Sequence, residues 1–194
     1  MLDRIFEEAL KYATEKHRGM LRKAEDIPFI IHPMEVATIA ASMTTDRAVL
    51  AACLLHDTVE DTDATIEDIT EKFGERIARL VSCETEDKHA DRPANETWEQ
   101  RKAESLAKLA KADDINVKIM WLSDKLANLR AFYRNYLEYG DDMWNLFNQK
   151  DPAKHEWYYR QIGELTSELS NFVAWREYNN YLDMLFGGND NESD

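Results

Sequence analysis

The chain has 194 residues, of which 44% are hydrophobic and 32% are charged. This length and composition are typical of one globular domain with its own core, and they exclude an intrinsically disordered chain. Lys and Arg number 24 against 38 Asp and Glu, which gives a net charge of −14 at pH 7. Such a charge argues against sequence-independent binding to nucleic acid or to an anionic membrane, because both are polyanions.

The cellular compartment is predicted from the cysteines and the apolar runs. No apolar run approaches the roughly 20 residues of a membrane span. The first ten residues read as an amphipathic helix that contains acids, so no signal peptide is expected. Cys53 and Cys83 both lie in apolar helical stretches and are expected to be reduced core thiols. We therefore expect a cytoplasmic protein.

In the first half of the chain, apolar residues recur at helical spacing. A first helix is expected over 2–13, and a loop over 19–31 follows it. Pro33 is expected at the first position of the second helix. Asp46 is the expected N-cap of a third helix that ends near His56.

The next helix begins with a recognisable cap. Thr65, with Asp68 three residues later, resembles a capping box, and Gly74 is expected to end that helix. Another helix is expected over 75–85.

The second half continues as helices. A polar loop with Pro93 is expected over 87–95, and helices are expected over 96–111, 114–139 and 153–186, with the longer two open to interruption. No stretch reads as a convincing strand, and 28–31 is at most a short extended piece. The predicted fold is all-α, a single helical-bundle domain over 1–186. Residues 187–194 form a small acidic tail that is expected to be disordered.

The most informative segment is Leu-Leu-His-Asp-Thr-Val-Glu-Asp-Thr over residues 54–62. An apolar run over 49–55 leads into His56 and Asp57, and Glu60 and Asp61 follow within the length of one helical turn. Buried charges destabilise a fold unless they are paired or bound to a cation. The segment therefore predicts a divalent metal site that activates water.

Four residues are candidate metal ligands. His32 precedes Pro33 at a helix start, and Asp124 is embedded in an apolar helical run. His56 and Asp57 are neighbours, which diverge by about 100° on a helix, so they can share one ion only where the backbone bends. Mixed nitrogen and carboxylate ligands suit Mn²⁺, Fe²⁺ or Zn²⁺, and Mn²⁺ is favoured for a phosphate substrate.

Each of these residues also has a purely structural interpretation. His32 could be a capping or surface residue, Asp124 could pair with a neighbouring lysine, and Asp61 could cap a helix. The basic, acid-free stretch 16–23 could attract a polyphosphate substrate, or it could be a solvated loop.

The remaining histidines and aromatics receive weaker predictions. His17 and His89 have no compelling spacing and are expected at the surface. The aromatic stretch 155–159 is expected in the core, with a pocket wall as the alternative.

With these motifs, the chain resembles the HD metal-dependent phosphohydrolase superfamily. More narrowly, it looks like the hydrolase domain of the Rel/SpoT homologues, and closest to the stand-alone small alarmone hydrolases. The resemblance covers roughly residues 1–170, and it is carried by the segments 17–23, 27–33, 54–62, 73–88 and 123–129. The ordered combination of His-Pro, His-Asp-Thr-Val-Glu-Asp-Thr and Asp-Lys-Leu-x-Asn-Leu makes it specific.

The resemblance implies a role for each candidate residue. The metal ligands, usually to Mn²⁺, would be His32, His56, Asp57 and Asp124. Glu60 and Asp61 match the acidic pair that orients and activates the attacking water. Arg22 and Lys23 match basic residues at the substrate's phosphates or base, and Asn128 matches a nucleotide contact. The implied reaction removes the 3′-pyrophosphate of guanosine tetra- or pentaphosphate (ppGpp or pppGpp) and leaves GDP or GTP.

Three positions depart from the family pattern. Met20 stands where many relatives carry Gln, Phe29 where Tyr is common, and Trp121 where Lys is frequent. Trp121 removes a potential phosphate contact, so another nucleotide, such as an adenosine alarmone, remains an alternative substrate. An antitoxin that counteracts a toxic alarmone synthetase is a further alternative. The sequence is also compatible with a homo-oligomer.

Overall fold

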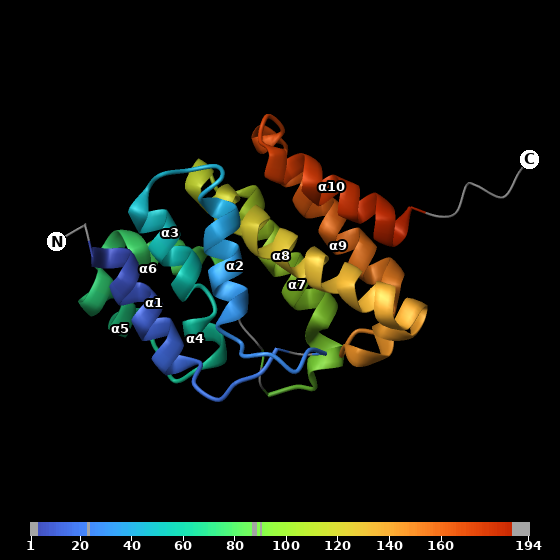
Figure 1. Cartoon of the computed structure of the whole chain (residues 1–194), viewed down its shortest axis with the longest axis horizontal. Helices are drawn as coiled ribbons and strands as arrows, with labels where there is room; N and C mark the ends of the chain where they lie inside the picture. Colours follow the sequence, from blue (N-terminus) through green and yellow to red (C-terminus); the bar gives the residue numbers. More distant parts are fainter. Residues whose placement is uncertain (1–3, 23, 87–88, 90, 188–194) are drawn as a thin grey trace, which may run out of the picture.

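The computed structural model describes residues 4–22, 24–86, 89 and 91–187. Every named secondary-structure element in these ranges is a helix (Figure 1). The first six helices are α1 (Ile5–Lys16), α2 (Ile31–Ala40), α3 (Arg47–Leu55), α4 (Thr58–Asp61), α5 (Ile66–Phe73) and α6 (Glu75–Glu84). They are followed by α7 (Ala94–Ala110), α8 (Ile115–Tyr139), the 3₁₀ helix η2 (Gly140–Leu146), α9 (Pro152–Leu165), the 3₁₀ turn η3 (Ser167–Leu169) and α10 (Val173–Phe186). The predicted all-α class is confirmed.

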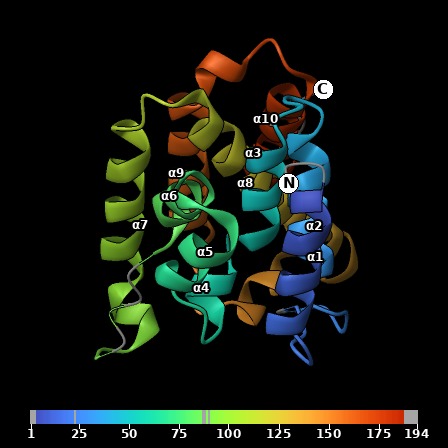
Figure 2. The same cartoon turned by 90° about the vertical axis from the view of Figure 1, so that its left-hand side faces the viewer.

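Helix α8 is the central element of the bundle. It packs against α2 and α10 most extensively, and also against α3, α6 and α9 (Figures 1 and 2). The helix is roughly 38 Å long at 1.5 Å per residue. Its middle carries Met120, Trp121, Leu122 and Leu126, each at most 1% exposed. Ser123 and Asp124, on the same stretch, are likewise buried in the core.

The predicted starts of the helices before and after the segment 54–62 are confirmed. The Asp46 side chain accepts a hydrogen bond from the Ala48 N–H at 3.0 Å and caps α3. Thr65 and Asp68 make both hydrogen bonds of a capping box at α5. Gly74 separates α5 from α6 with φ of 86°, a conformation that favours glycine.

Helix α2 begins earlier than predicted. Ile31 is its first residue, so Pro33 is the third rather than the first. The Ile31 and His32 N–H groups already donate to Pro28 and Phe29 carbonyls, at 3.2 and 3.0 Å. Pro33 is tolerated there because the first turn of a helix leaves N–H groups unused. The short extended piece predicted over 28–31 is instead mostly this turn, apart from an isolated bridge between Leu21 and Pro28.

The helix predicted over 153–186 is interrupted in the structure. It forms α9 and α10, joined through η3, and the Tyr178 hydroxyl donates to the Tyr159 carbonyl at 2.7 Å between them.

Cys53 is buried, Cys83 is half-buried, and both thiols are free, as predicted. No helix in the described ranges is long and apolar enough to cross a membrane. The tail prediction for 187–194 falls almost wholly outside the described residues, and the proposed domain boundary remains a prediction.

Candidate metal centre

Three of the predicted ligands converge from three different helices. His32 lies in the first turn of α2, His56 follows the last residue of α3, and Asp124 lies in the middle of α8. Asp124 Oδ1 is 3.0 Å from His32 Nε2 and 3.7 Å from His56 Nε2. All three residues are buried, and they offer ligand atoms within 4.8 Å of one another. Together they form the only such group of three or more among the described residues.

Asp57 lies at the edge of this cluster. The chain bends between α3 and α4, so that His56 follows α3 and Asp57 precedes α4. Asp57 Oδ2 is 3.1 Å from His56 Nε2 and 3.5 Å from His32 Nε2. The two neighbours therefore approach the same place, which the backbone bend was expected to allow. Asp57 is nevertheless not a member of the three-residue group.

The His56 ring fits a cation at this place. Its Nδ1 lies 2.8 Å from the buried Cys53 carbonyl, so Nδ1 carries the proton and donates. Nε2 is then the lone-pair nitrogen, and it is buried without a hydrogen-bond partner. Because it faces the Asp57 and Asp124 carboxylates, only a proton or a metal cation between these groups makes the contacts favourable. Both imidazole nitrogens and carboxylate oxygens are ligands for divalent transition metals.

The pKa shifts of His56, Asp124 and His32 reflect their burial and the charged groups around them. Burial lowers the pKa of His56, but the Asp57 and Asp124 carboxylates outweigh it and raise the pKa well above 6.5. For Asp124, burial would raise the pKa, yet Lys125 and the two imidazoles hold it well below 3.8. Burial lowers the pKa of His32 despite its hydrogen bond to Asp124, which favours the neutral ring that a metal requires.

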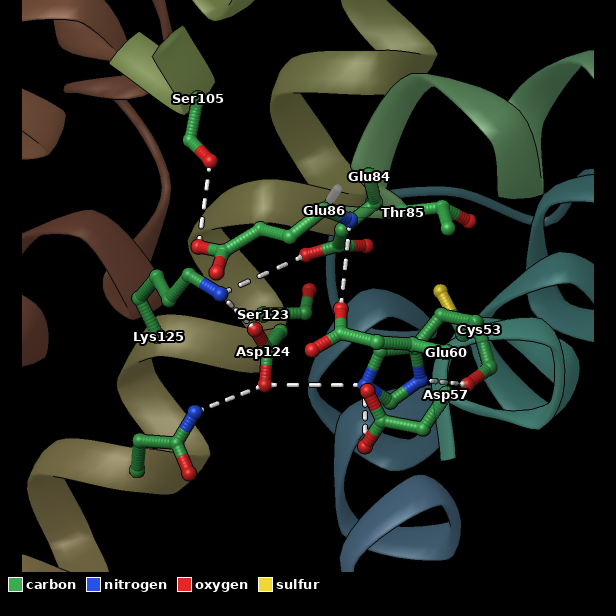
Figure 3. Close-up of polar contacts among 12 residues, drawn as sticks. Cys53, Asp57, Glu60, Glu84, Thr85, Glu86, Ser105, Ser123, Asp124 and Lys125 are labelled. Atoms are coloured by element: carbon green, nitrogen blue, oxygen red, sulfur yellow. Dashed lines mark hydrogen bonds and ion pairs between the residues drawn. The ribbon is translucent and has the colours of Figure 1, made fainter. Parts of the chain in front are cut away.

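Asp124 is oriented by its neighbours on α8. Its Oδ2 contacts the Lys125 ammonium (Figure 3). Its Oδ1 accepts a hydrogen bond from Asn128 Nδ2 at 2.8 Å. Arg22 Nη2 donates in turn to Asn128 Oδ1 at 3.0 Å. The structure thus brings the predicted substrate contacts Arg22 and Asn128 together beside Asp124. Lys23, the third predicted contact, lies outside the described residues.

The predicted catalytic pair lies on the short helix α4, directly after Asp57. Glu60 and Asp61 are both half-buried. Glu60 Oε2 accepts a hydrogen bond from the Glu86 N–H at 3.3 Å, and Figure 3 shows Glu60 between Asp57 and the backbone of Glu86. The Asp61 N–H donates to the Asp57 carbonyl at 2.9 Å, which fixes the turn that carries the pair.

The sequence interpretation assigned no role to Glu84, which lies behind the cluster. It is 7% exposed, neither carboxyl oxygen has a hydrogen-bond partner, and Lys125 Nζ is 4.0 Å away. Burial and the nearby Asp124 carboxylate raise the pKa of Glu84 to about 8. The available signal was its helical spacing after the apolar positions 77, 80 and 81 of α6, which places an acid on a buried face.

The surface prediction for His17 is wrong. His17 is 3% exposed, and its ring packs against Phe29 with centroids 4.5 Å apart. It follows Ala9 and Ala13 at four-residue spacing on the buried face of α1, which is the signal that was overlooked. His89 is half-buried and pairs with Glu104 at 3.0 Å.

The aromatic positions lie mainly in the core. His155, Tyr158 and Tyr159 are buried, as the core interpretation predicted, whereas Trp157 is 43% exposed. Trp121 is 1% exposed, and its ring lies beneath Lys125, with the ammonium 5.1 Å from the ring centroid. Trp121 therefore contributes packing under the cluster rather than a phosphate contact.

Comparison with known proteins identifies the fold around this cluster. The model of the HD domain family matches residues 9–145. The chain belongs to the HD-domain family. The matched range contains His32, His56 and Asp124, and this buried cluster fits a divalent metal ion.

Among relatives, the chain is 40% identical over 133 residues to the guanosine-3′,5′-bis(diphosphate) 3′-pyrophosphohydrolase MESH1 of Drosophila melanogaster, covering 67% of this chain and 70% of that protein. It is 39% identical over 129 residues to a GTP pyrophosphokinase of Myxococcus xanthus, covering 66% of this chain. The match spans only 17% of the length of that longer relative.

The fold is also similar to solved structures. A metazoan ortholog of SpoT that hydrolyzes ppGpp superimposes with a TM-score of 0.70 at 29% identity, over 94% of both chains. A Listeria monocytogenes EGD-e protein superimposes with a TM-score of 0.67 at 29% identity, over 80% of this chain. The HD-domain assignment therefore rests on both sequence and structure.

Proposed function

We propose that this HD domain is a metal-dependent hydrolase that removes the 3′-pyrophosphate of guanosine tetra- or pentaphosphate and leaves GDP or GTP. The observation that carries the proposal is the buried His32, His56 and Asp124 cluster, whose His56 Nε2 lone pair faces carboxylates. The pyrophosphohydrolase and the ppGpp-hydrolyzing SpoT ortholog to which the chain is similar support the choice of substrate.

His32, His56, Asp57 and Asp124 would hold the metal, and we propose Mn²⁺ as the ion. Two imidazoles with two carboxylates suit this metal, and Mn²⁺ also accepts phosphate oxygens. When bound, a divalent cation supplies Lewis acidity, which lowers the pKa of water and neutralises charge on phosphate. The hydrogen bond from His56 Nδ1 to Cys53 and the two contacts of Asp124 keep these ligands in place before the ion arrives.

Glu60 and Asp61 are the proposed proton acceptors. A water oxygen forms a bond to the phosphorus that carries the ribose 3′-oxygen, and the bond from that phosphorus to the 3′-oxygen breaks. The attacking water gives a proton to the carboxylate pair, and the departing 3′-oxygen takes up a proton. The products are pyrophosphate and the nucleoside 5′-di- or triphosphate. The carboxylates lie on α4, which begins directly after Asp57, so they border the place where the ligands converge.

Arg22 and Asn128 are the proposed nucleotide contacts. The guanidinium of Arg22 already donates to Asn128, and its central carbon lies 5.9 Å from the centroid of the Phe29 ring. A cation fixed in this way can bind a phosphate oxygen or stack on a base. It also offsets part of the net charge of −14 that a polyanionic substrate would otherwise meet. We expect the activity in the cytoplasm, where thiols such as Cys53 stay reduced.

The test is release of pyrophosphate from guanosine 3′,5′-bis(diphosphate) with and without Mn²⁺. We expect hydrolysis with Mn²⁺ and at least a hundredfold slower hydrolysis in Asp61→Asn, because general-base catalysis contributes about 10²–10⁴-fold. Asp63→Asn, two residues further on and exposed, is the matched control and should retain activity.

A parallel substrate panel decides the nucleotide. Preference for the adenosine analogue would overturn the assignment to guanosine. If the chain hydrolysed none of the nucleoside 3′-diphosphates, the proposal that it is a hydrolase would be overturned. If Asp61→Asn still protected cells from a toxic alarmone synthetase, the chain would act on that partner by binding rather than by hydrolysis.

A further inference from the structure

A cavity of ≈ 410 Å³ lies beside the proposed catalytic pair. Glu60 forms one wall, and α7 contributes Trp98 and Arg101. Asn148 and Gln149, which precede α9, line the cavity together with His155. The cavity is therefore bordered by a residue of the site already described, but its other walls come from α7, from the segment before α9 and from α9, which carry none of the proposed metal ligands or catalytic residues.

Arg101 is the charged residue that α7 contributes to the cavity wall. Arg101 Nη1 donates to Glu86 Oε2 at 2.9 Å, and Lys102 Nζ donates to Glu86 Oε1 at 2.5 Å. Two cations thus share the Glu86 carboxylate, so that this carboxylate neutralises only part of their charge. Arg101 Nε is in addition buried without any hydrogen-bond partner. A buried donor without a partner destabilises a protein, which indicates that a ligand or an ordered water normally accepts from it.

The cavity is rich in donors. Gln149 Oε1 already accepts from the Asp151 N–H at 3.0 Å, so its amide N–H groups remain to donate. The Gln149 carbonyl is occupied by His155 Nε2 at 2.9 Å. With Arg101, and with the amide of Asn148, these groups favour an anion over a neutral or cationic ligand. The Glu60 carboxylate would repel such an anion, and Arg101 and Lys102, which share the single Glu86 carboxylate, offset that repulsion.

Glu86 connects the cavity to the catalytic pair. Its side chain holds Arg101 and Lys102, while its backbone N–H donates to Glu60. Arg22 and Asn128, in contrast, lie on the Asp124 side of the candidate metal centre, because Arg22 donates to Asn128 and Asn128 donates to Asp124. A ligand with one phosphate at the metal centre can therefore extend a second phosphate past Glu60 toward Arg101, while its nucleoside lies toward Arg22.

We infer that this cavity, the Arg101 cavity, binds the terminal phosphate of the substrate's 3′-diphosphate and then the pyrophosphate product. This inference rests on the proposed function and assigns Arg101 as a residue that recognises the diphosphate. It separates the two products, because pyrophosphate contacts Arg101 whereas the nucleoside 5′-diphosphate contacts Arg22 and Asn128.

Product inhibition tests this separation. Hydrolysis is measured with inorganic pyrophosphate or with GDP as the inhibitor, for the wild-type chain and for Arg101→Gln. Loss of the charged contact should raise the inhibition constant for pyrophosphate about tenfold or more, equivalent to ~1.4 kcal/mol, and should change that for GDP less than twofold. Arg79→Gln, an exposed α6 arginine that pairs with Asp114, is the matched control and should change neither constant.

A second variant guards against a simple loss of folding in Arg101→Gln. Ala94 lines the cavity at the exposed start of α7, so Ala94→Leu narrows the cavity without breaking an ion pair. It should also weaken inhibition by pyrophosphate and leave inhibition by GDP unchanged. Unchanged inhibition by pyrophosphate in both variants, or equal changes for both products, would overturn the inference.

Failure of the proposed function is distinguishable from failure of this inference. If the wild-type chain hydrolyses no 3′-diphosphate, the proposed function fails, and calorimetric titration with inorganic pyrophosphate in Mn²⁺ replaces the inhibition assay. Binding that is weakened by Arg101→Gln would then support the Arg101 cavity. Equal binding by both chains, or no binding by the wild-type chain, would overturn it.

Discussion

Replacing Glu84 with Gln should stabilise the metal-free protein, and the gain should depend on pH. Glu84 is buried beside the cluster, and neither of its carboxyl oxygens has a hydrogen-bond partner. Its pKa is raised from 4.5 to about 8 by burial and by Asp124. Gln has nearly the same shape but cannot ionise, so Glu84→Gln removes the titration and keeps the packing.

The sign and size follow from proton linkage. The folded chain retains the Glu84 proton up to about pH 8, whereas the unfolded chain loses it near pH 4.5. The unfolded state therefore binds fewer protons between these values, and the wild-type free energy of unfolding falls as the pH rises through this window. At ~1.4 kcal/mol per pH unit, the variant should exceed the wild type by about 1 kcal/mol at pH 5 and about 3 kcal/mol at pH 7.

Urea denaturation in the presence of a chelator, at pH 5, 6, 7 and 8, measures this difference. Glu71→Gln, at an exposed position of α5, is the control and should change the free energy of unfolding by less than about 0.5 kcal/mol at every pH. A stability difference between wild type and Glu84→Gln that stays constant with pH would refute the reasoning, because it would mean that Glu84 titrates alike in both states.

Three further outcomes are expected. Mn²⁺ at a hundred times its dissociation constant should stabilise the wild-type chain by about 2.7 kcal/mol in thermal unfolding, and the absence of a metal-dependent shift in the wild type would contradict the site. Trp121→Ala should lower the free energy of unfolding by about 3–5 kcal/mol in urea, because Trp121 is 1% exposed, and a loss under 1 kcal/mol would show that the ring is not core. Arg22→Gln should raise KM about tenfold or more while Mn²⁺ affinity stays unchanged, and an equal loss of Mn²⁺ would show that Arg22 supports the metal ligands instead.

Local chain chemistry predicted much of the fold. The caps at Asp46 and Thr65 and the stop at Gly74 depend on hydrogen bonds and dihedral angles within a few residues, so they can be recognised without tertiary contacts. The break between α9 and α10 could not be located in this way. It is fixed by contacts such as that of Tyr178 with Tyr159, which are nineteen residues apart.

For the site, the sequence indicated the ligands but not their surroundings. His32, His56 and Asp124 were identified because imidazoles and an acid next to apolar runs are unusual, and the structure brings them together. Their assignment as metal ligands remains a proposal. Glu84 and His17 were missed because each is a single polar residue on an otherwise apolar helix face, and such a residue gains meaning only when the packing shows what it faces.

The central claim is that one divalent ion at the His32, His56 and Asp124 cluster is required for cleavage of the 3′-diphosphate. Mn²⁺ occupancy by equilibrium dialysis and pyrophosphate release from guanosine 3′,5′-bis(diphosphate) can be measured on the same samples across a Mn²⁺ titration. We predict that the wild-type rate rises in proportion to occupancy and saturates at one ion per chain, and that a His56→Gln and Asp124→Asn double variant neither binds the ion nor releases pyrophosphate. Full activity in the presence of a chelator, or unchanged Mn²⁺ binding by the double variant, would contradict the account.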